Sequence, residues 1–149
     1  MKKIILSIII SFLSITCVFS HNDHYKDINV LEYELFRNGK LIGFHNYNFT
    51  KKDNKLIVDS VVKFNIKKLG VNLYNYDATS QEIYENDQLI KFKSKTNQNK
   101  KTKYVNIEYD SNLKELVIDG SSNKSNSPKD FIIGTWWNHS IIEAKAQIS

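Results

Sequence analysis

The chain has 149 residues, which is the size of one ordinary domain. Its composition, 41% hydrophobic and 25% charged, is that of a globular protein and excludes a disordered or fibrous chain. The formal charge is +5, and Arg37 is the single arginine among the 21 basic residues. Because bidentate recognition of bases and phosphates relies on arginine, we expect no nucleic-acid partner.

The N-terminal segment has the features of a secretory signal peptide. Lys2 and Lys3 precede an apolar run over residues 4–19, with small residues near its end. We predict a signal peptide over residues 1–20, cleaved after Ser20, and therefore a periplasmic or secreted protein. An uncleaved anchor helix is the alternative, but the run is short for the roughly 30 Å of hydrocarbon in a bilayer. We expect no stable membrane span after cleavage.

The one cysteine, Cys17, lies inside this segment. A lipoprotein signal places Leu three residues before the lipidated cysteine and Gly, Ala or Ser directly before it. Here Ser14 and Thr16 occupy those positions, so we do not expect a lipoprotein. If Cys17 leaves with the signal, the mature domain has no disulfide, no thiol nucleophile and no thiolate metal site.

Residues 21–28 are polar and are predicted to form a disordered leader. His21, Asp23 and His24 could together bind a metal, but histidines in a loose N-terminal segment are more often simply solvated. We therefore expect neither a metal nor a cofactor.

Alternating apolar and polar residues predict antiparallel strands in the domain that we assign to residues 29–149. The predicted ranges are 30–36, 41–50, 55–67, 71–85, 89–96, 103–109 and 113–119. Between the first two, Asn38-Gly39 is a strong hairpin signal, since a type I′ turn needs positive φ at both central residues. Residues 120–129 are rich in Ser and Asn and contain the only proline, Pro128, so we predict a surface loop there.

These elements predict a mainly β fold: a single antiparallel meander, either a strongly curved sheet or a partly closed barrel. The pattern changes at the end, where both tryptophans, Trp136 and Trp137, stand side by side. Adjacent side chains on an extended segment diverge, so one is expected to plug the inner face while the other faces outward. Asn138 is predicted to cap a short helix over residues 139–144.

The sequence contains no catalytic motif of a familiar kind, such as a nucleophile elbow, a glycine-rich phosphate loop or a His-Glu-x-x-His zinc site. Two polar residues, His45 and Glu82, lie on otherwise apolar strand faces. As a pair they could act as general acid and base. The favoured interpretation is a hydrogen-bonded polar patch, or exposure of one of the two to water, because nothing beside them supplies a nucleophile or a metal.

A stripe of lysines follows one face of the fifth predicted strand and continues past it. Its members are Lys91, Lys93 and Lys95, with Lys100, Lys101 and Lys103 nearby. Such a stripe can meet anionic lipid headgroups, but we expect a solvated outer face of an edge hairpin, where lysines oppose edge-to-edge aggregation.

Four stretches carry a resemblance. Residues 33–45 read Tyr-Glu-Leu-Phe-Arg-Asn-Gly-Lys-Leu-Ile-Gly-Phe-His; 68–76 contain Lys-Leu-Gly and two tyrosines; 80–84 read Ser-Gln-Glu-Ile-Tyr; and 135–138 read Thr-Trp-Trp-Asn. This combination resembles an uncharacterised family of exported, periplasmic proteobacterial proteins, a domain of unknown function with a Ser/Thr-Trp-Trp-Asn signature.

The resemblance implies a periplasmic β-rich domain without an assigned activity. The positions that match the family motif are Gly43, His45, Tyr74, Glu82, Trp136, Trp137 and Asn138. The chain departs from the family at His139, where a proline is usual as the first helical residue. The family also continues with further strands, so we expect the domain to be incomplete at its C-terminus.

Three functions follow from these observations. We favour a binding or carrier module for a lipid or another apolar or amphipathic small molecule, with polar residues orienting the ligand and the tryptophans closing the mouth. The alternatives are a hydrolase that uses His45 and Glu82 as acid and base, and a non-catalytic structural partner of envelope proteins. No catalytic residue is assigned. The candidate ligand-binding residues are His45, Tyr74, Tyr76, Glu82, Trp136, Trp137 and Asn138.

Overall fold

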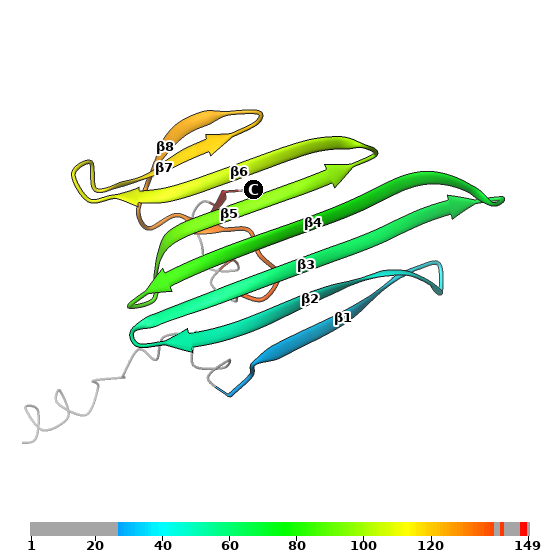
Figure 1. Ribbon diagram of the computed structural model, residues 1–149, viewed down its shortest axis with the longest axis horizontal. Coiled ribbons are helices and arrows are strands. Elements are labelled where there is room, and N and C mark those ends of the chain that lie inside the picture. The colour runs from blue at the N-terminus through cyan, green and yellow to red at the C-terminus, as the bar shows by residue number, and fades with distance from the viewer. Residues whose placement is uncertain (1–26, 139–140, 142–146, 149) are drawn as a thin grey trace, which may run out of the picture.

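The computed structural model describes residues 27–138, 141 and 147–148. Its main element is one eight-stranded antiparallel sheet in which every strand pairs with the next along the chain (Figure 1). The strands are β1 (Val30–Arg37), β2 (Lys40–Lys52), β3 (Lys55–Lys68), β4 (Val71–Glu85), β5 (Gln88–Gln98), β6 (Lys101–Asp110), β7 (Glu115–Gly120) and β8 (Lys124–Pro128). The predicted antiparallel meander is confirmed.

Tight turns set the register of the meander. Asn38 and Gly39 have φ values of 49° and 73°, and Asn86 and Asp87 have 49° and 62°. Positive φ at both central residues matches the right-handed twist of the flanking strands, and Asn, Asp and Gly adopt it at low cost. All seven predicted strands are present, each within a few residues of its predicted ends.

The prediction of a surface loop over residues 120–129 is wrong for its second half. Residues 124–128 form β8, which pairs with β7 from Asp119↔Lys124 to Glu115↔Pro128. The composition of the segment predicts a loop because Ser, Asn and Pro are poor strand formers. Among the described strands β8 has a partner on one side only, and an edge strand tolerates proline because one row of its N–H groups needs no ladder partner.

The sheet is open, so the alternative of a partly closed barrel is also wrong. Among the described residues, β1 and β8 each pair with a single neighbour and not with each other. The central strands β3 and β4 have 14 and 15 residues, whereas β1 has eight and β8 has five. Closure of a barrel needs a continuous hydrogen-bonded ladder between the two edge strands. Two edge strands this short and unequal could share only a short ladder.

The hydrophobic core covers one part of the inner face of the sheet. Its buried members are Tyr47, Phe49, Val58, Tyr84, Leu89, Ile107, Leu116, Ile133 and Trp137. The last two come from the segment after β8, which runs back across the inner face. Within it the two-residue strand β9 (Ile132–Ile133) pairs in parallel with β10 (Gln147–Ile148).

Several predictions fall on residues outside the described part of the chain. These are the signal peptide, Cys17, residues 21–26 of the leader with its histidine pair, and most of the helix predicted over 139–144. Of that helix only Ile141 is described, so the described residues do not support it. The last residue of the predicted leader, Ile28, is described and packs against the core. Within the described residues, no helix has the length and apolarity needed to cross a bilayer.

Candidate functional site

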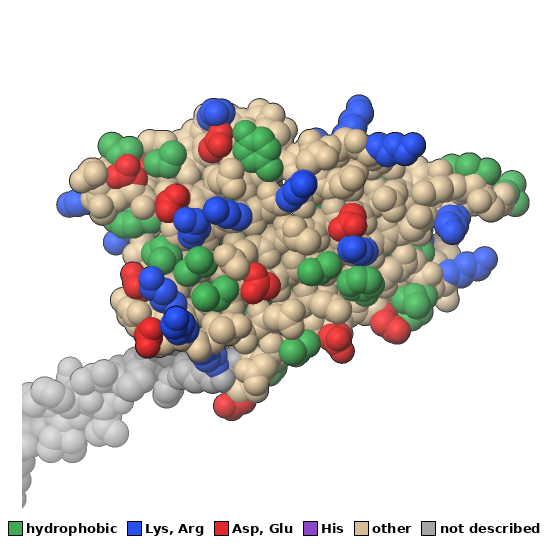
Figure 2. Space-filling model, viewed as in Figure 1, with side chains coloured by type: hydrophobic (Ala, Val, Ile, Leu, Met, Phe, Trp, Pro, Cys, Tyr) green, Lys and Arg blue, Asp and Glu red, His purple; other side chains and the backbone are tan. Residues whose placement is uncertain are grey.

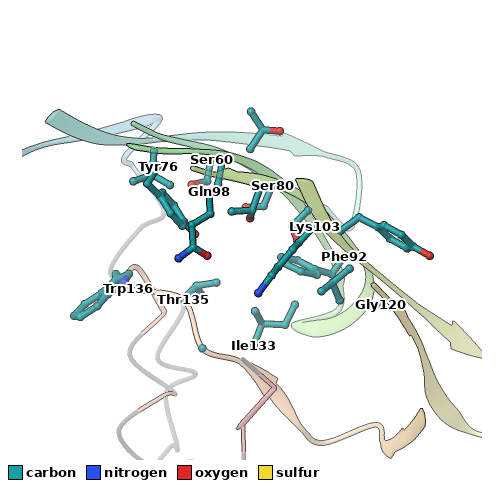
Figure 3. Close-up of a pocket in the computed structure, with 18 of the residues that line it drawn as sticks. Ser60, Tyr76, Ser80, Phe92, Gln98, Lys103, Gly120, Ile133, Thr135 and Trp136 are labelled. Carbon is teal, nitrogen blue, oxygen red and sulfur yellow. The ribbon is translucent and has the colours of Figure 1, made fainter. Parts of the chain in front are cut away.

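A hollow of about 1300 Å³ lies between the inner face of the sheet and the segment 131–136. Strands β1 to β8 all contribute residues to its lining, and Figure 3 shows side chains from the sheet pointing toward Ile133 and Thr135 on the other side. The hollow adjoins the core and is open to solvent.

Small hydroxylated side chains create this space. Ser60 on β3 is directly opposite Ser80 on β4, and Ser80 is directly opposite Ser94 on β5. Ala78 and Thr96 form the next pair along β4 and β5, and all five residues line the hollow. A packed core would have large apolar residues at the centre of three adjacent strands. The serine row, as we call Ser60, Ser80 and Ser94, leaves that volume unfilled.

His45 lies at the β2 end of the serine row. Its Nε2 is 2.9 Å from Ser60 Oγ, and its ring packs on Tyr47 with 4.3 Å between centroids. Burial lowers the pKa of His45, because desolvation disfavours the charged imidazolium. At neutral pH the ring is therefore uncharged and offers one nitrogen as donor and the other as acceptor.

Aromatic rings form the wall at one end of the hollow. Phe64 and Tyr76 line it and stack with 5.1 Å between their centroids. Tyr74 extends this stack, 5.7 Å from Phe64 and 6.4 Å from Tyr76, but it lies outside the lining. Of the two candidate tyrosines, only Tyr76 can touch a molecule in the hollow.

Glu82 is fully buried in a separate hydrogen-bonded cluster within the core. The Tyr84 hydroxyl donates to its Oε2 at 2.6 Å, and the Trp137 indole donates to Oε1 and Oε2 at 3.1 and 3.2 Å. Burial raises the pKa of Glu82 to about 7, against the opposing effect of the hydrogen bonds from Tyr84 and Trp137. Glu82 is not part of the lining of the hollow.

The two tryptophans diverge as predicted. Trp137 has no exposed surface and meets Phe49 and Tyr84 edge-on, at 5.4 and 5.7 Å between centroids. Trp136 is 86% exposed and stands at the rim of the hollow (Figure 3). Asn138 is buried beside Trp137, with its side chain hydrogen-bonded to Tyr84, and its carbonyl accepts from the Ile141 amide at 3.2 Å.

The structure does not bring His45 and Glu82 together. His45 is opposite Val62 on β3, whereas Glu82 is opposite Val58, four residues away on the same strand. At about 3.4 Å per residue this separation is roughly 14 Å along the strands alone. The two side chains also have different hydrogen-bond partners. They do not form the acid–base couple that a hydrolase of the kind considered above would need.

The candidate residues thus divide into three groups. His45, Tyr76 and Trp136 line the hollow, whereas Glu82, Trp137 and Asn138 belong to the core cluster and Tyr74 to the aromatic stack. Sequence reasoning missed most of the lining, including Ser94, Thr96, Gln98 and Lys103. The sequence feature that points to the hollow is the set of small or polar residues at the inward positions of β3, β4 and β5. This pattern becomes visible only when the three strands are aligned.

Two hydroxyl groups of the lining are buried without a partner. Within the described residues, Ser127 Oγ and Thr135 Oγ1 make no hydrogen bond. Both residues line the hollow. Buried hydroxyl groups usually find a partner in the protein, in water or in a ligand. No cluster of three potential metal ligands occurs among residues that the structure describes.

A comparison with known proteins identifies one family. The model of a domain of unknown function (DUF6134) matches residues 33–149, from β1 through the serine row to the tryptophan pair. No curated protein and no solved structure matches the chain.

Proposed function

The chain belongs to this family of unknown function, and we propose its role from the site alone: it is a binding or carrier module for an apolar or amphipathic small molecule. The molecule occupies the hollow beneath the sheet. The observation that carries the proposal is the serine row, which leaves space for a ligand where a core would be packed.

The chemistry of the lining supports an amphipathic ligand. Apolar surface comes from Val62, Phe64, Tyr76, Phe92 and Ile133, which can cover a hydrocarbon or ring system. The lining also contains many polar side chains, which can fix the orientation of a ligand. They include the hydroxyls of the serine row, the unpaired hydroxyls of Ser127 and Thr135, the neutral ring of His45, Gln98 and Lys103.

We propose that the protein works outside the cytoplasm. Residues 1–20 have the composition of a cleavable secretory signal, with Lys2 and Lys3 before an apolar run. A carrier for apolar molecules is useful in an aqueous compartment next to a membrane. Mass spectrometry of the protein recovered from cell envelopes or medium is expected to give an N-terminus at His21, and an intact Met1 would contradict export by this route.

Ligand binding can be tested with anilinonaphthalene sulfonate, an amphipathic anion whose fluorescence rises in apolar surroundings. We expect saturable binding to the wild-type protein. The variant Ser80→Leu places a larger side chain in the middle of the serine row, so it should retain the fold and weaken binding by about tenfold or more, the effect of roughly 1.4 kcal/mol. Organic extraction of the protein, followed by mass spectrometry, should release a bound amphiphile from wild type and much less from Ser80→Leu.

The matched control is Lys95→Leu, an exposed position on the neighbouring strand and the opposite face. It adds the same side chain without entering the hollow, so binding should stay at the wild-type level. Equal binding by wild type, Ser80→Leu and Lys95→Leu, with no extractable molecule, would show that the hollow is not a binding site.

A further inference from the structure

One end of the sheet is strongly basic. In a meander the odd-numbered turns lie at the same end of the strands. Figure 1 shows the first, third and fifth on the right, whereas the seventh joins the short strands β7 and β8 and does not reach as far. Residues 36–41, 66–73 and 97–103, which we call the basic end, contain seven cationic residues and no acidic residue. The cations are Arg37, Lys40, Lys67, Lys68, Lys100, Lys101 and Lys103. The turns at the opposite end, residues 51–56, 85–88 and 110–115, contain four cations and five acids.

The longest hairpin carries exposed apolar residues to the tip of the basic end. Leu69 is 95% exposed, Val71 61% and Leu73 55%. Strand β2 pairs with β3 only as far as Phe64, and contact of β4 with the β5–β6 hairpin ends at Asn75, so residues 65–74 of this hairpin project beyond their neighbours. Figure 2 shows the hydrophobic side chains of this projection at the far right of the molecule, with Lys and Arg side chains below them.

The turn of this hairpin contains a leucine at a position that does not favour it. Leu69 and Gly70 occupy its two central positions with φ values of 51° and 78°. The other non-glycine residues with positive φ in the described chain are polar, namely Asn38, Asp53, Asn86, Asp87, Asn99, Lys100 and Lys114. A leucine is unfavourable here for two reasons. Its side chain clashes with the backbone in the left-handed conformation, and its apolar surface is exposed to water. Such conflicts between a residue and its surroundings are often found at functional sites.

We propose that the basic end docks on an anionic lipid bilayer. Leu69, Val71 and Leu73 enter the interface between headgroups and acyl chains, where their apolar surface leaves water. The seven cations lie behind them at the level of the negatively charged headgroups and are attracted to these. The absence of acidic residues from all three turns gives this end the charge complementarity that a lipid surface requires.

The same orientation turns one side of the hollow toward the bilayer. Tyr76 and Gln98 are paired at the start of the β4–β5 ladder, next to the basic end, and both line the hollow. Lys103, one of the seven cations, also points into it (Figure 3). Docking at this end therefore puts the hollow close to a source of amphipathic molecules, although docking itself does not depend on the hollow being a binding site.

The experiment measures co-sedimentation with vesicles of phosphatidylcholine alone and of equal parts phosphatidylcholine and phosphatidylglycerol. The full chain is expressed, and wild type and variants are compared in the same processed form. We expect binding to the anionic vesicles that weakens as salt is added. Leu69→Asn restores the Asn-Gly pair preferred in type I′ turns, so it should keep or raise thermal stability while weakening binding about fivefold or more. The double variant Lys67→Gln/Lys68→Gln should weaken binding about 25-fold, since each cation near an anionic surface contributes a factor of about five.

Matched controls lie at the opposite end of the sheet. Leu113→Asn replaces an exposed leucine in another turn, and Lys51→Gln/Lys52→Gln removes two lysines from the β2–β3 hairpin. Both should bind anionic vesicles as wild type does. The proposal is overturned if wild type binds neutral and anionic vesicles equally or not at all, or if the control variants lose as much binding as the test variants. It is also overturned if only the lysine variant loses binding, because the basic end would then be a site for soluble polyanions and not for a bilayer.

Discussion

Glu82 is a carboxyl group with no contact with solvent, and its surroundings decide its charge. Desolvation disfavours the carboxylate, whereas donation from Tyr84 and Trp137 favours it. Desolvation is the larger effect, and the pKa of about 7 leaves the group divided between its two protonation states near neutrality. This residue therefore couples the stability of the fold to pH.

We expect the free energy of unfolding to fall as the pH rises from 4.5 to about 7. In this window the unfolded chain has already released the Glu82 proton at its ordinary pKa of 4.5, while the folded protein still holds it. The unfolded state then binds fewer protons, which lowers stability by up to about 1.4 kcal/mol per pH unit. Below and above the window this contribution is constant. Urea unfolding followed by tryptophan fluorescence across these pH values measures the slope.

Glu82→Gln should remove this contribution, because the amide does not titrate. His45 has the opposite effect, since its lowered pKa makes the protein lose stability as the pH falls below 6.5. The difference between wild type and Glu82→Gln cancels the His45 contribution. Glu108→Gln, at an exposed glutamate that pairs with Lys91, is the matched control and should keep the wild-type slope. An unchanged slope in Glu82→Gln would show that Glu82 has an ordinary pKa.

Strands β2 and β3 lie unusually close together at Gly43. Gly43 is paired with Phe64, next to the register shift between Leu35 and Phe36 on β1. A Cβ atom built on Gly43 would overlap the Lys63 carbonyl oxygen and the Phe64 Cα. The backbone of the neighbouring strand therefore leaves no room for a side chain at this position. This explains a glycine in the middle of a long strand, away from any turn.

Gly43→Ala is expected to destabilise the protein by about 1–3 kcal/mol, or more if the strands cannot separate. The overlap is with backbone atoms, which can move only by disturbing the β2–β3 ladder. Chemical denaturation measures the loss. Asn48→Ala, at an exposed position of the same strand, serves as the comparison and should change stability by less than about 0.5 kcal/mol. Similar stability for both variants would contradict the close approach.

The elements themselves could be predicted where local chemistry dominates. Asn38-Gly39 places the first hairpin, and alternation places β3 and β4 to within a residue of their ends. Strand β8 could not be predicted this way, because its residues Lys-Ser-Asn-Ser-Pro have low strand propensity and gain their conformation from pairing with β7. Strand β9 could not be predicted for another reason: Ile132 and Ile133 are good strand formers, but two residues are too few to show an alternating pattern, and the strand is defined by its pairing with β10.

The whole molecule is an open sheet whose stability is unevenly distributed. The middles of β3 and β4 have partners on both sides, whereas β8 has one partner among the described strands and residues 65–74 project beyond the sheet. Amides open to exchange more readily where pairing is one-sided and buried contacts are few.

Hydrogen exchange monitored by mass spectrometry should reflect this distribution. Peptides covering 57–64 and 76–83 are expected to exchange slowest, and those covering 65–75 and 124–128 at least about tenfold faster, equivalent to about 1.4 kcal/mol in opening free energy. Adding anionic vesicles should slow exchange in 65–75 and leave 124–128 unchanged. Equally slow exchange in 65–75 and 57–64 without vesicles would mean that the hairpin does not project.

Local sequence patterns suffice to predict the β class, the meander, the positions of the turns and the divergence of Trp136 and Trp137, because these depend on alternation and on residues adjacent in the chain. The open sheet and the return of the segment 131–138 across its inner face arise only when the chain is folded. So does the contact of Glu82 with Trp137, 55 residues away, in place of a contact with His45. Contacts of this kind depend on how far the sheet curves and where the chain folds back onto it, and no local pattern encodes either. The serine row depends on both the sequence and the tertiary structure. Each serine can be read from the sequence, but the hollow exists only because three strands bring the serines side by side.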